Sequence, residues 1–136
     1  MNERDQDMRI RVLVVDPEPD DRWNLIYHVQ CAGAQATGVA SGRAGLASLF
    51  RRRPDVIISS LVLPDTSGLR ILENAKNYWP FVRVILTAKW RSRALYDRVS
   101  RAGASDLIRH PVREREVLAV LARFWAARIG DEEPAL

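Results

Sequence analysis

The feature of this sequence that most limits its fold is a series of short apolar runs that alternate with helical segments. The run "IRVLVV" at 10–15 is almost wholly apolar and rich in β-branched residues, which is typical of a strand buried on both faces. Four further strands are predicted, at 34–40, 55–59, 82–88 and 105–111. Five helices are predicted to follow the strands in turn, at 20–32, 41–50, 69–77, 92–102 and 113–128.

This alternation restricts the topology. Strands separated by helical crossovers pair in parallel, and the helices then cover both faces of the sheet. The predicted fold is therefore a doubly wound α/β domain with a five-stranded parallel sheet and five flanking helices. Functional groups in such sheets gather at the carboxyl ends of the strands. Four residues follow the first, third, fourth and fifth strands and are inspected for that reason: Asp16, Ser60, Thr87 and His110.

The length of 136 residues fits one domain, which we expect at 9–128 between a disordered segment at 1–8 and an acidic tail at 129–136. The one cysteine, Cys31, excludes an internal disulfide, and its apolar helical surroundings predict a buried side chain. No apolar run approaches the roughly 18 residues that a membrane span needs. The charged start of the chain lacks the apolar core of a signal peptide, so a cytoplasmic location is expected.

The basic charge is unevenly distributed. Between Arg83 and Arg128 there are eleven Lys and Arg residues against four Asp and Glu residues, and the net charge of the chain is +4. Basic stretches can bind nucleic acid or another anionic partner, which is one alternative for this half of the chain. Because no nucleic-acid-binding motif accompanies the charge, solvated helix faces are the favoured interpretation, and no nucleic-acid partner is expected.

Four segments carry a resemblance to a known family. "VLVVDPEPD" at 12–20 is similar to "VLVVDDEPD", and "PDVIISSLVLPDTSGLRIL" at 54–72 is similar to "PDLVLLDIMLPDMDGLELL". "VRVILTA" and "RAGASDLIRHP" are similar to "PVIVLTA" and "AGADDYLTKP". The family with these motifs is the receiver domain of bacterial two-component response regulators. The resemblance covers about 9–128 and implies the flavodoxin-like or CheY-like strand order 2-1-3-4-5.

The resemblance also implies a site. In active receivers, two adjacent acids after strand one and an aspartate at the end of strand three hold Mg²⁺, and that aspartate accepts the phosphoryl group. A Thr or Ser after strand four and a Lys after strand five contact the phosphoryl oxygens. Asp16 and Thr87 match this pattern. Pro17, Ser60 and His110 replace the second acid, the phosphoacceptor aspartate and the lysine.

These replacements predict a degenerate phosphorylation pocket. Mg²⁺ prefers hard oxygen ligands that usually include one or two carboxylates, and only Asp16 and Glu18 remain as nearby acids. We therefore expect weak or absent Mg²⁺ binding and no other cofactor. A serine hydroxyl does not supply the carboxylate that forms an acyl phosphate, and a neutral His110 does not supply the charge of a lysine. The chain is not expected to be an enzyme.

Smaller expectations concern single side chains. Asp16 should be held by backbone N–H groups or an arginine, because an unpaired buried charge is expensive. Ser60 should bond to a neighbour, and Thr87 should bond within the pocket. Asp65 and Thr66 are interpreted as turn residues.

The favoured function is a stand-alone signalling domain that acts through protein–protein interaction without phosphorylation. Trp and Arg are the residues most enriched in binding hot spots, and receivers commonly pair through the face formed by the fourth helix, fifth strand and fifth helix. The candidate partner surface, which could also form a homodimer, consists of Trp90, Arg91, Arg109, Arg113 and Trp125. Two further tryptophans, Trp23 and Trp79, are expected at the edge of the core.

One alternative retains a switch. In that interpretation a dedicated kinase phosphorylates Ser59, Ser60 or Thr87. A phosphoserine survives acid treatment that destroys an acyl phosphate, so the two chemistries can be separated.

Overall fold

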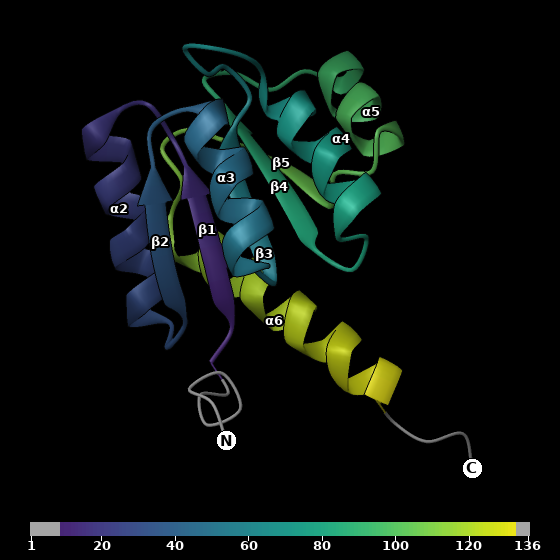
Figure 1. Ribbon diagram of the computed structural model, residues 1–136. Coiled ribbons are helices and arrows are strands. Elements are labelled where there is room, and N and C mark those ends of the chain that lie inside the picture. The colour runs from purple at the N-terminus through teal and green to yellow at the C-terminus, as the bar shows by residue number, and fades with distance from the viewer. Residues whose placement is uncertain (1–8, 133–136) are drawn as a thin grey trace.

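The computed structural model describes residues 9–132, in which strands and helices alternate as predicted (Figure 1). The five strands are β1 Arg11–Val15, β2 Gln35–Val39, β3 Val56–Ser60, β4 Arg83–Ala88 and β5 Asp106–Arg109. The five helices are α2 Pro19–Cys31, α3 Gly42–Arg52, α4 Gly68–Tyr78, α5 Arg93–Arg101 and α6 Glu114–Glu132. None of the helices within the described part of the chain combines the length and hydropathy that crossing a bilayer requires.

The sheet is parallel throughout and has the order β2-β1-β3-β4-β5, which confirms the predicted fold. Val15 pairs with Ser59, Ser60 pairs with Thr87, and Ala88 pairs with Arg109. This register places the carboxyl ends of β1, β3, β4 and β5 along one edge, which is called the carboxyl edge below.

Side chains that alternate along the strands build two apolar layers. Val12 and Val14 face the layer that contains the buried residues of α2 and α6. Leu13 and Val15 face the layer that contains those of α3, α4 and α5. In Figure 1, α3 and α4 lie in front of the sheet and α6 passes behind it. Burial on both faces explains why β1, β3 and β4 are nearly continuous apolar runs, whereas the partly buried edge strand β2 is more polar.

Serine hydroxyls cap three of the helices, as helix N-terminal preferences favour. Ser41 accepts from the N–H of Ala44, Ser67 from that of Leu69, and Ser92 from that of Leu95. The α2 helix instead begins with a proline, whose missing N–H would have no partner in the first turn.

The end of the last helix differs from the prediction. The α6 helix continues to Glu132, so the first four residues of the predicted tail at 129–136 are helical. Gly130 lowers helix stability but does not end the helix. The predicted segment 1–8 and the remainder of the tail, 133–136, lie outside the described residues.

Two predictions about α2 side chains are wrong. Cys31 is exposed rather than buried, and Trp23 is 66% exposed rather than at the core edge. Leu25 and Val29 form the buried stripe of the helix, whereas Trp23, Tyr27 and Cys31 follow one another at intervals of four and share the opposite, solvent-facing side. Trp79 does pack partly buried against the α3–α4–α5 layer, as predicted.

Candidate functional site

Backbone hydrogen bonds hold Asp16 and His110 at the carboxyl edge, where strand pairing also holds Ser60 and Thr87. The N–H of Asp16 donates to the carbonyl of Val39 at 3.0 Å, and the N–H of His110 donates to that of Ala88 at 2.8 Å. Both bonds continue the sheet ladder one residue beyond the end of a strand. The main chain around the site is therefore as well fixed as the sheet itself.

Asp16 is the buried acid of the site. Asp16 is only 2% exposed, and its Oδ1 accepts a hydrogen bond from the N–H of Glu18 at 2.9 Å. Within the described chain, Oδ2 has no hydrogen-bond partner. The guanidinium of Arg22 donates to the main-chain carbonyl of Asp16 at 2.8 Å and not to its carboxylate. The predicted backbone N–H is thus present, and the predicted arginine binds a different atom.

The environment of Asp16 disfavours its charge. Burial raises the pKa of the carboxyl group above its usual value, while the Glu18 N–H and the nearby His110 act in the opposite direction with smaller effects. A charge in this position is stabilised incompletely by its protein neighbours.

The two serines at the end of β3 bond within their own loop. The Ser60 hydroxyl donates to the carbonyl of Val62 at 2.9 Å, which is the expected local bond. The Ser59 hydroxyl donates to the carbonyl of Ser60 at 3.0 Å, and Ser59 is fully buried. The Ser60 hydroxyl, which the family resemblance aligns with the phosphoacceptor, is therefore already engaged.

The prediction that Thr87 bonds within the pocket is wrong. The residue is fully buried, and no partner for Oγ1 is found among residues 9–132. Ser60, its neighbour across the β3–β4 pair, directs its hydrogen to Val62 instead. The carboxyl edge thus contains two buried oxygens without hydrogen bonds, one on Thr87 and one on Asp16.

His110 lies between two carboxylates. Its Nε2 is 3.9 Å from Asp16 Oδ2, and its Nδ1 is 3.9 Å from Asp21 Oδ2. Both distances are longer than a hydrogen bond. The sequence around Asp21 predicts only the start of a helix and gives no signal that its side chain belongs to the site. Side chains in a first helical turn lean back toward the helix N-terminus, which brings Asp21 to the carboxyl edge.

The residues present do not fit the magnesium ion that the resemblance implies. Pro17 contributes no side-chain oxygen, and the Ser60 hydroxyl donates to its own loop. In the described chain, the metal-type side chains that cluster are Asp16, Asp21 and His110, and Glu18 is not among them. A set of two carboxylates and one imidazole is not the all-oxygen, near-octahedral set that Mg²⁺ prefers.

Asp65 has a larger role than the predicted turn. Its carboxylate accepts from the N–H of Gly42 at 2.8 Å and from that of Arg43 at 2.9 Å, so it caps α3 from a different part of the chain. These bonds to Arg43 and Gly42 lower the pKa of the Asp65 carboxyl below its usual value. They also tie the loop that follows β3 to α3.

Asp65→Ala is expected to lower the melting temperature at pH 7, because α3 loses two backbone hydrogen bonds. A carboxyl group with a lowered pKa contributes stability above its unfolded value, here 3.8, and loses it as the pH falls through the lower folded value. The difference in melting temperature between Asp65→Ala and wild type should therefore shrink as the pH falls through the folded-state pKa of Asp65, which lies below 3.8. Thermal unfolding from pH 7 to pH 3 measures it, with the exposed Glu73→Ala as control. A difference that does not change with pH would contradict this role.

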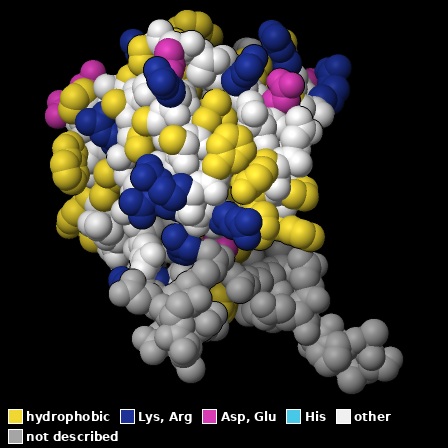
Figure 2. All heavy atoms as spheres, in the orientation of Figure 1, with side chains coloured by type: hydrophobic (Ala, Val, Ile, Leu, Met, Phe, Trp, Pro, Cys, Tyr) yellow, Lys and Arg dark blue, Asp and Glu magenta, His cyan; other side chains and the backbone are white. Residues whose placement is uncertain are grey.

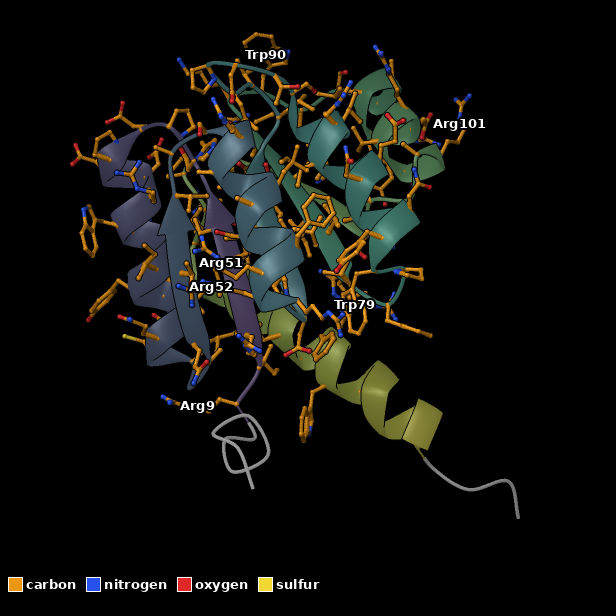
Figure 3. All side chains as sticks on the ribbon, in the orientation of Figure 1. Arg9, Arg51, Arg52, Trp79, Trp90 and Arg101 are labelled. Atoms are coloured by element: carbon orange, nitrogen blue, oxygen red, sulfur yellow. The ribbon has the colours of Figure 1, made fainter. Side chains whose placement is uncertain are left out.

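The candidate partner surface is exposed but not continuous. Trp90 is 71% exposed in the β4–α5 connection at the upper end of the molecule (Figure 3), and the guanidinium of Arg91 lies 4.8 Å from the ring centre of Tyr96. Arg109 and Arg113 are exposed as well. Trp125 is 43% exposed, but α6 leads away from the carboxyl edge and places it about 16 Å along the helix from Glu114 (Figure 1).

Sequence reasoning missed an aromatic surface at the C-terminal ends of α3 and α4. Phe50, Tyr78 and Phe81 are 44%, 43% and 81% exposed. The rings of Phe50 and Tyr78 pack edge to face, with their centroids 4.6 Å apart. Arg53 lies 5.2 Å from the ring centre of Trp79. Figure 2 shows hydrophobic side chains gathered on the face that carries α3 and α4, with basic side chains beside them. The helical pattern gave no signal because Phe50 and Tyr78 come from different helices.

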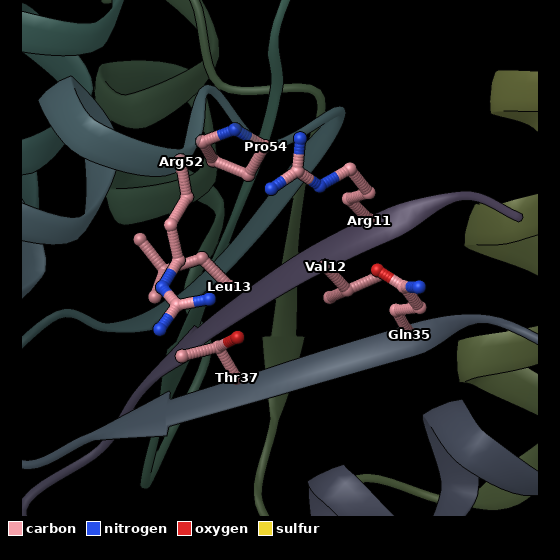
Figure 4. A pocket seen from close by; sticks show the side chains of 7 residues that line it. All are labelled: Arg11, Val12, Leu13, Gln35, Thr37, Arg52 and Pro54. Atoms are coloured by element: carbon pink, nitrogen blue, oxygen red, sulfur yellow. The ribbon is translucent and has the colours of Figure 1, made fainter. Parts of the chain in front are cut away.

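A small basic hollow lies over β1 and β2. Figure 4 shows it between the two strands and the end of α3, with the side chains of Arg11 and Arg52 at its rim. Its complete lining is Arg11, Val12, Leu13, Gln35, Thr37, Arg52 and Pro54.

The fold and the carboxyl-edge site define a receiver-type α/β domain, and comparison with known proteins agrees. The model of the response regulator receiver domain family matches residues 12–122. The chain therefore belongs to the response regulator receiver domain family.

Curated relatives are longer than this chain. It is 34% identical over 112 residues to the probable transcriptional regulatory protein TcrX of Mycobacterium tuberculosis, covering 80% of this chain and 47% of the relative. It is 30% identical over 123 residues to the DNA-binding transcriptional regulator NtrC of Salmonella typhimurium, covering 90% of this chain and 26% of the relative. The chain thus spans about half or less of the length of these relatives.

Solved structures share the fold. A CheY-like receiver domain protein from Methanospirillum hungatei has a TM-score of 0.83 at 22% identity, covering 90% of this chain and 98% of that one. The BeF₃-activated receiver domain of DrrB, a Thermotoga maritima protein, has a TM-score of 0.80 at 24% identity, covering 88% and 99%. At these identities the likeness establishes the fold alone.

Proposed function

We propose that this receiver domain is degenerate: it signals through contact with partner proteins, independently of phosphorylation and magnesium, and is not an enzyme. The observation that carries the proposal is the Ser60 hydroxyl, which stands where the family has its phosphoacceptor aspartate and donates to the Val62 carbonyl at 2.9 Å. A hydroxyl that donates to a main-chain carbonyl rather than to a general base lacks the activation that a nucleophile needs. Pro17 removes the second acid, which leaves a phosphoryl group without the magnesium ion that offsets its charge in active receivers.

Burial argues against most of the serine and threonine alternative. Ser59 and Thr87 are both fully buried, so a kinase could reach either hydroxyl only after the sheet edge opened. Ser60 is only partly buried and is the remaining candidate of the three.

The partner surface of the proposal centres on the exposed Trp90 and on Arg91, Arg109 and Arg113. Exposed Trp and Arg side chains are the residue types most enriched in binding hot spots. We place a protein partner or a second copy of the chain on the face of α5, β5 and α6, and we expect no nucleic acid there.

Incubation of the whole protein with acetyl phosphate and Mg²⁺ is expected to leave its mass unchanged. The reason is that wild type has neither the carboxylate acceptor nor the acid pair for the ion. Intact-mass spectrometry is the measurement. A phosphate on wild type that disappears in Ser60→Ala would overturn the proposal, and its survival in acid would identify phosphoserine.

A restored variant provides the matched positive control. Pro17→Asp, Ser60→Asp and His110→Lys together rebuild the family pattern on the same backbone. This triple variant is expected to gain an acid-labile phosphate under the conditions that leave wild type unmodified, because the acceptor, the metal ligands and the cation are then present together.

A further inference from the structure

We propose that Asp16, Asp21 and His110 form a binding site for a divalent transition-metal ion of the Zn²⁺ class. One potential ligand atom from each side chain lies within 4.8 Å of the others. The three residues come from the β1–α2 connection, the first turn of α2 and the β5–α6 connection. An ion at this point would join segments that are far apart in the sequence.

The potential ligand atoms lie slightly farther apart than they would around a bound ion. The imidazole lies 3.9 Å from each carboxylate, through a different ring nitrogen in each case. Around Zn²⁺ with bonds of about 2.1 Å, tetrahedral ligands lie roughly 3.4 Å apart. A rotation of the ring and shifts of about an ångström would therefore close the set around an ion. Three protein ligands would leave one position for water.

An independent observation points to a missing ligand. Asp16 Oδ2, in a residue only 2% exposed, has no hydrogen-bond partner in the described chain although it faces His110. Its other oxygen is held by the N–H of Glu18 at 2.9 Å. A buried carboxylate oxygen without a partner is destabilising, and a metal ion would remove that penalty. The bond from Glu18 would act as the supporting contact that metal-binding carboxylates usually have.

The donor types select the class of metal. Imidazole nitrogen combined with carboxylate oxygen suits Zn²⁺, Co²⁺ and Ni²⁺, whereas Mg²⁺ retains water and oxygen ligands. The site differs from the one that the family resemblance implies, because Asp21 and His110 are not part of that magnesium set. It also departs from the expectation of no cofactor, which treated His110 only as a replacement for lysine.

Titration of chelator-treated, tag-free protein with Zn²⁺ tests the proposal. Isothermal calorimetry should show one equivalent bound, the melting temperature should rise by several degrees, and Co²⁺ should give a visible absorption band. His110→Gln and Asp21→Asn should each weaken Zn²⁺ binding at least 10- to 100-fold, since even residues that only support metal ligands have effects of that size. Circular dichroism of the metal-free variants checks that they are folded.

Matched controls use the other metal-type side chains of α2. His28→Gln removes the second of the two histidines and Cys31→Ser the lone cysteine, and both variants should bind Zn²⁺ as wild type does. Absence of Zn²⁺ binding, equal binding by folded His110→Gln protein, or equal affinity for Mg²⁺ would each overturn the proposal. The experiment contains no phosphoryl donor, so its outcome is separate from that of the acetyl phosphate test.

Discussion

Leu86→Ala is expected to lower the free energy of unfolding by about 2–5 kcal/mol. Leu86 is fully buried on the inner strand β4 and packs in the same apolar layer as Ile57 and Ile71. The substitution removes apolar contacts and leaves a cavity, which neighbours on a rigid sheet fill only in part. Domains of this kind are stable by about 5–15 kcal/mol, so the loss is large.

Urea unfolding of Leu86→Ala measures this loss, and a second leucine provides the control. Leu118 is 45% exposed on α6, and Leu118→Ala should change the free energy of unfolding by no more than about 0.5–1 kcal/mol. Equal losses at the two positions would mean that the layer beneath α3, α4 and α5 does not determine stability.

Gly68→Ala is the substitution expected to disturb the candidate site most directly. A Cβ on Gly68 would lie 2.5 Å from the main-chain carbonyl oxygen of Ser60 and 3.0 Å from Leu86 Cδ2. The N–H of Gly68 donates to the carbonyl of Leu61 at 2.8 Å, so the helix start cannot move without losing that bond. We expect a loss of about 1–3 kcal/mol and a displacement of the Ser60 loop.

A double-mutant cycle with Leu86→Ala separates the side-chain contact from the backbone contacts. Leu86→Ala removes the contact at 3.0 Å but leaves the Ser60 carbonyl oxygen, and Leu61 Cα at 3.1 Å, in place. Gly68→Ala should therefore remain destabilising in the Leu86→Ala background, as urea unfolding would show. If it became neutral there, the Ser60 carbonyl would not be the obstacle.

The order and type of the elements could be predicted because each signal is local. A buried parallel strand needs apolar residues at every position, and helices need a repeating stripe, so both patterns are visible without knowledge of contacts. The end of α6 was less predictable, because the residues at 129–132 neither favour nor forbid a helix strongly.

The candidate site was predictable only in part. The strand-end rule located Asp16, Ser60, Thr87 and His110, and the sheet register does bring their strand ends together. The rule could not give the direction of each side chain. The absence of a partner for Thr87 depends on where the Ser60 hydroxyl points, which depends in turn on the loop.

From the residues alone came the alternation of elements, the parallel sheet and the expectation that Pro17 and Ser60 replace an acid and the phosphoacceptor of the family, since each depends on residue type and spacing. Only the tertiary structure placed Asp21 beside His110, made Asp65 a cap for α3 and left Asp16 Oδ2 without a hydrogen bond among the described residues. The physical reason is that these contacts are long-range in the sequence. These contacts join side chains from different segments, and distances of a few ångströms between such segments are decided by how helices and loops pack on the sheet.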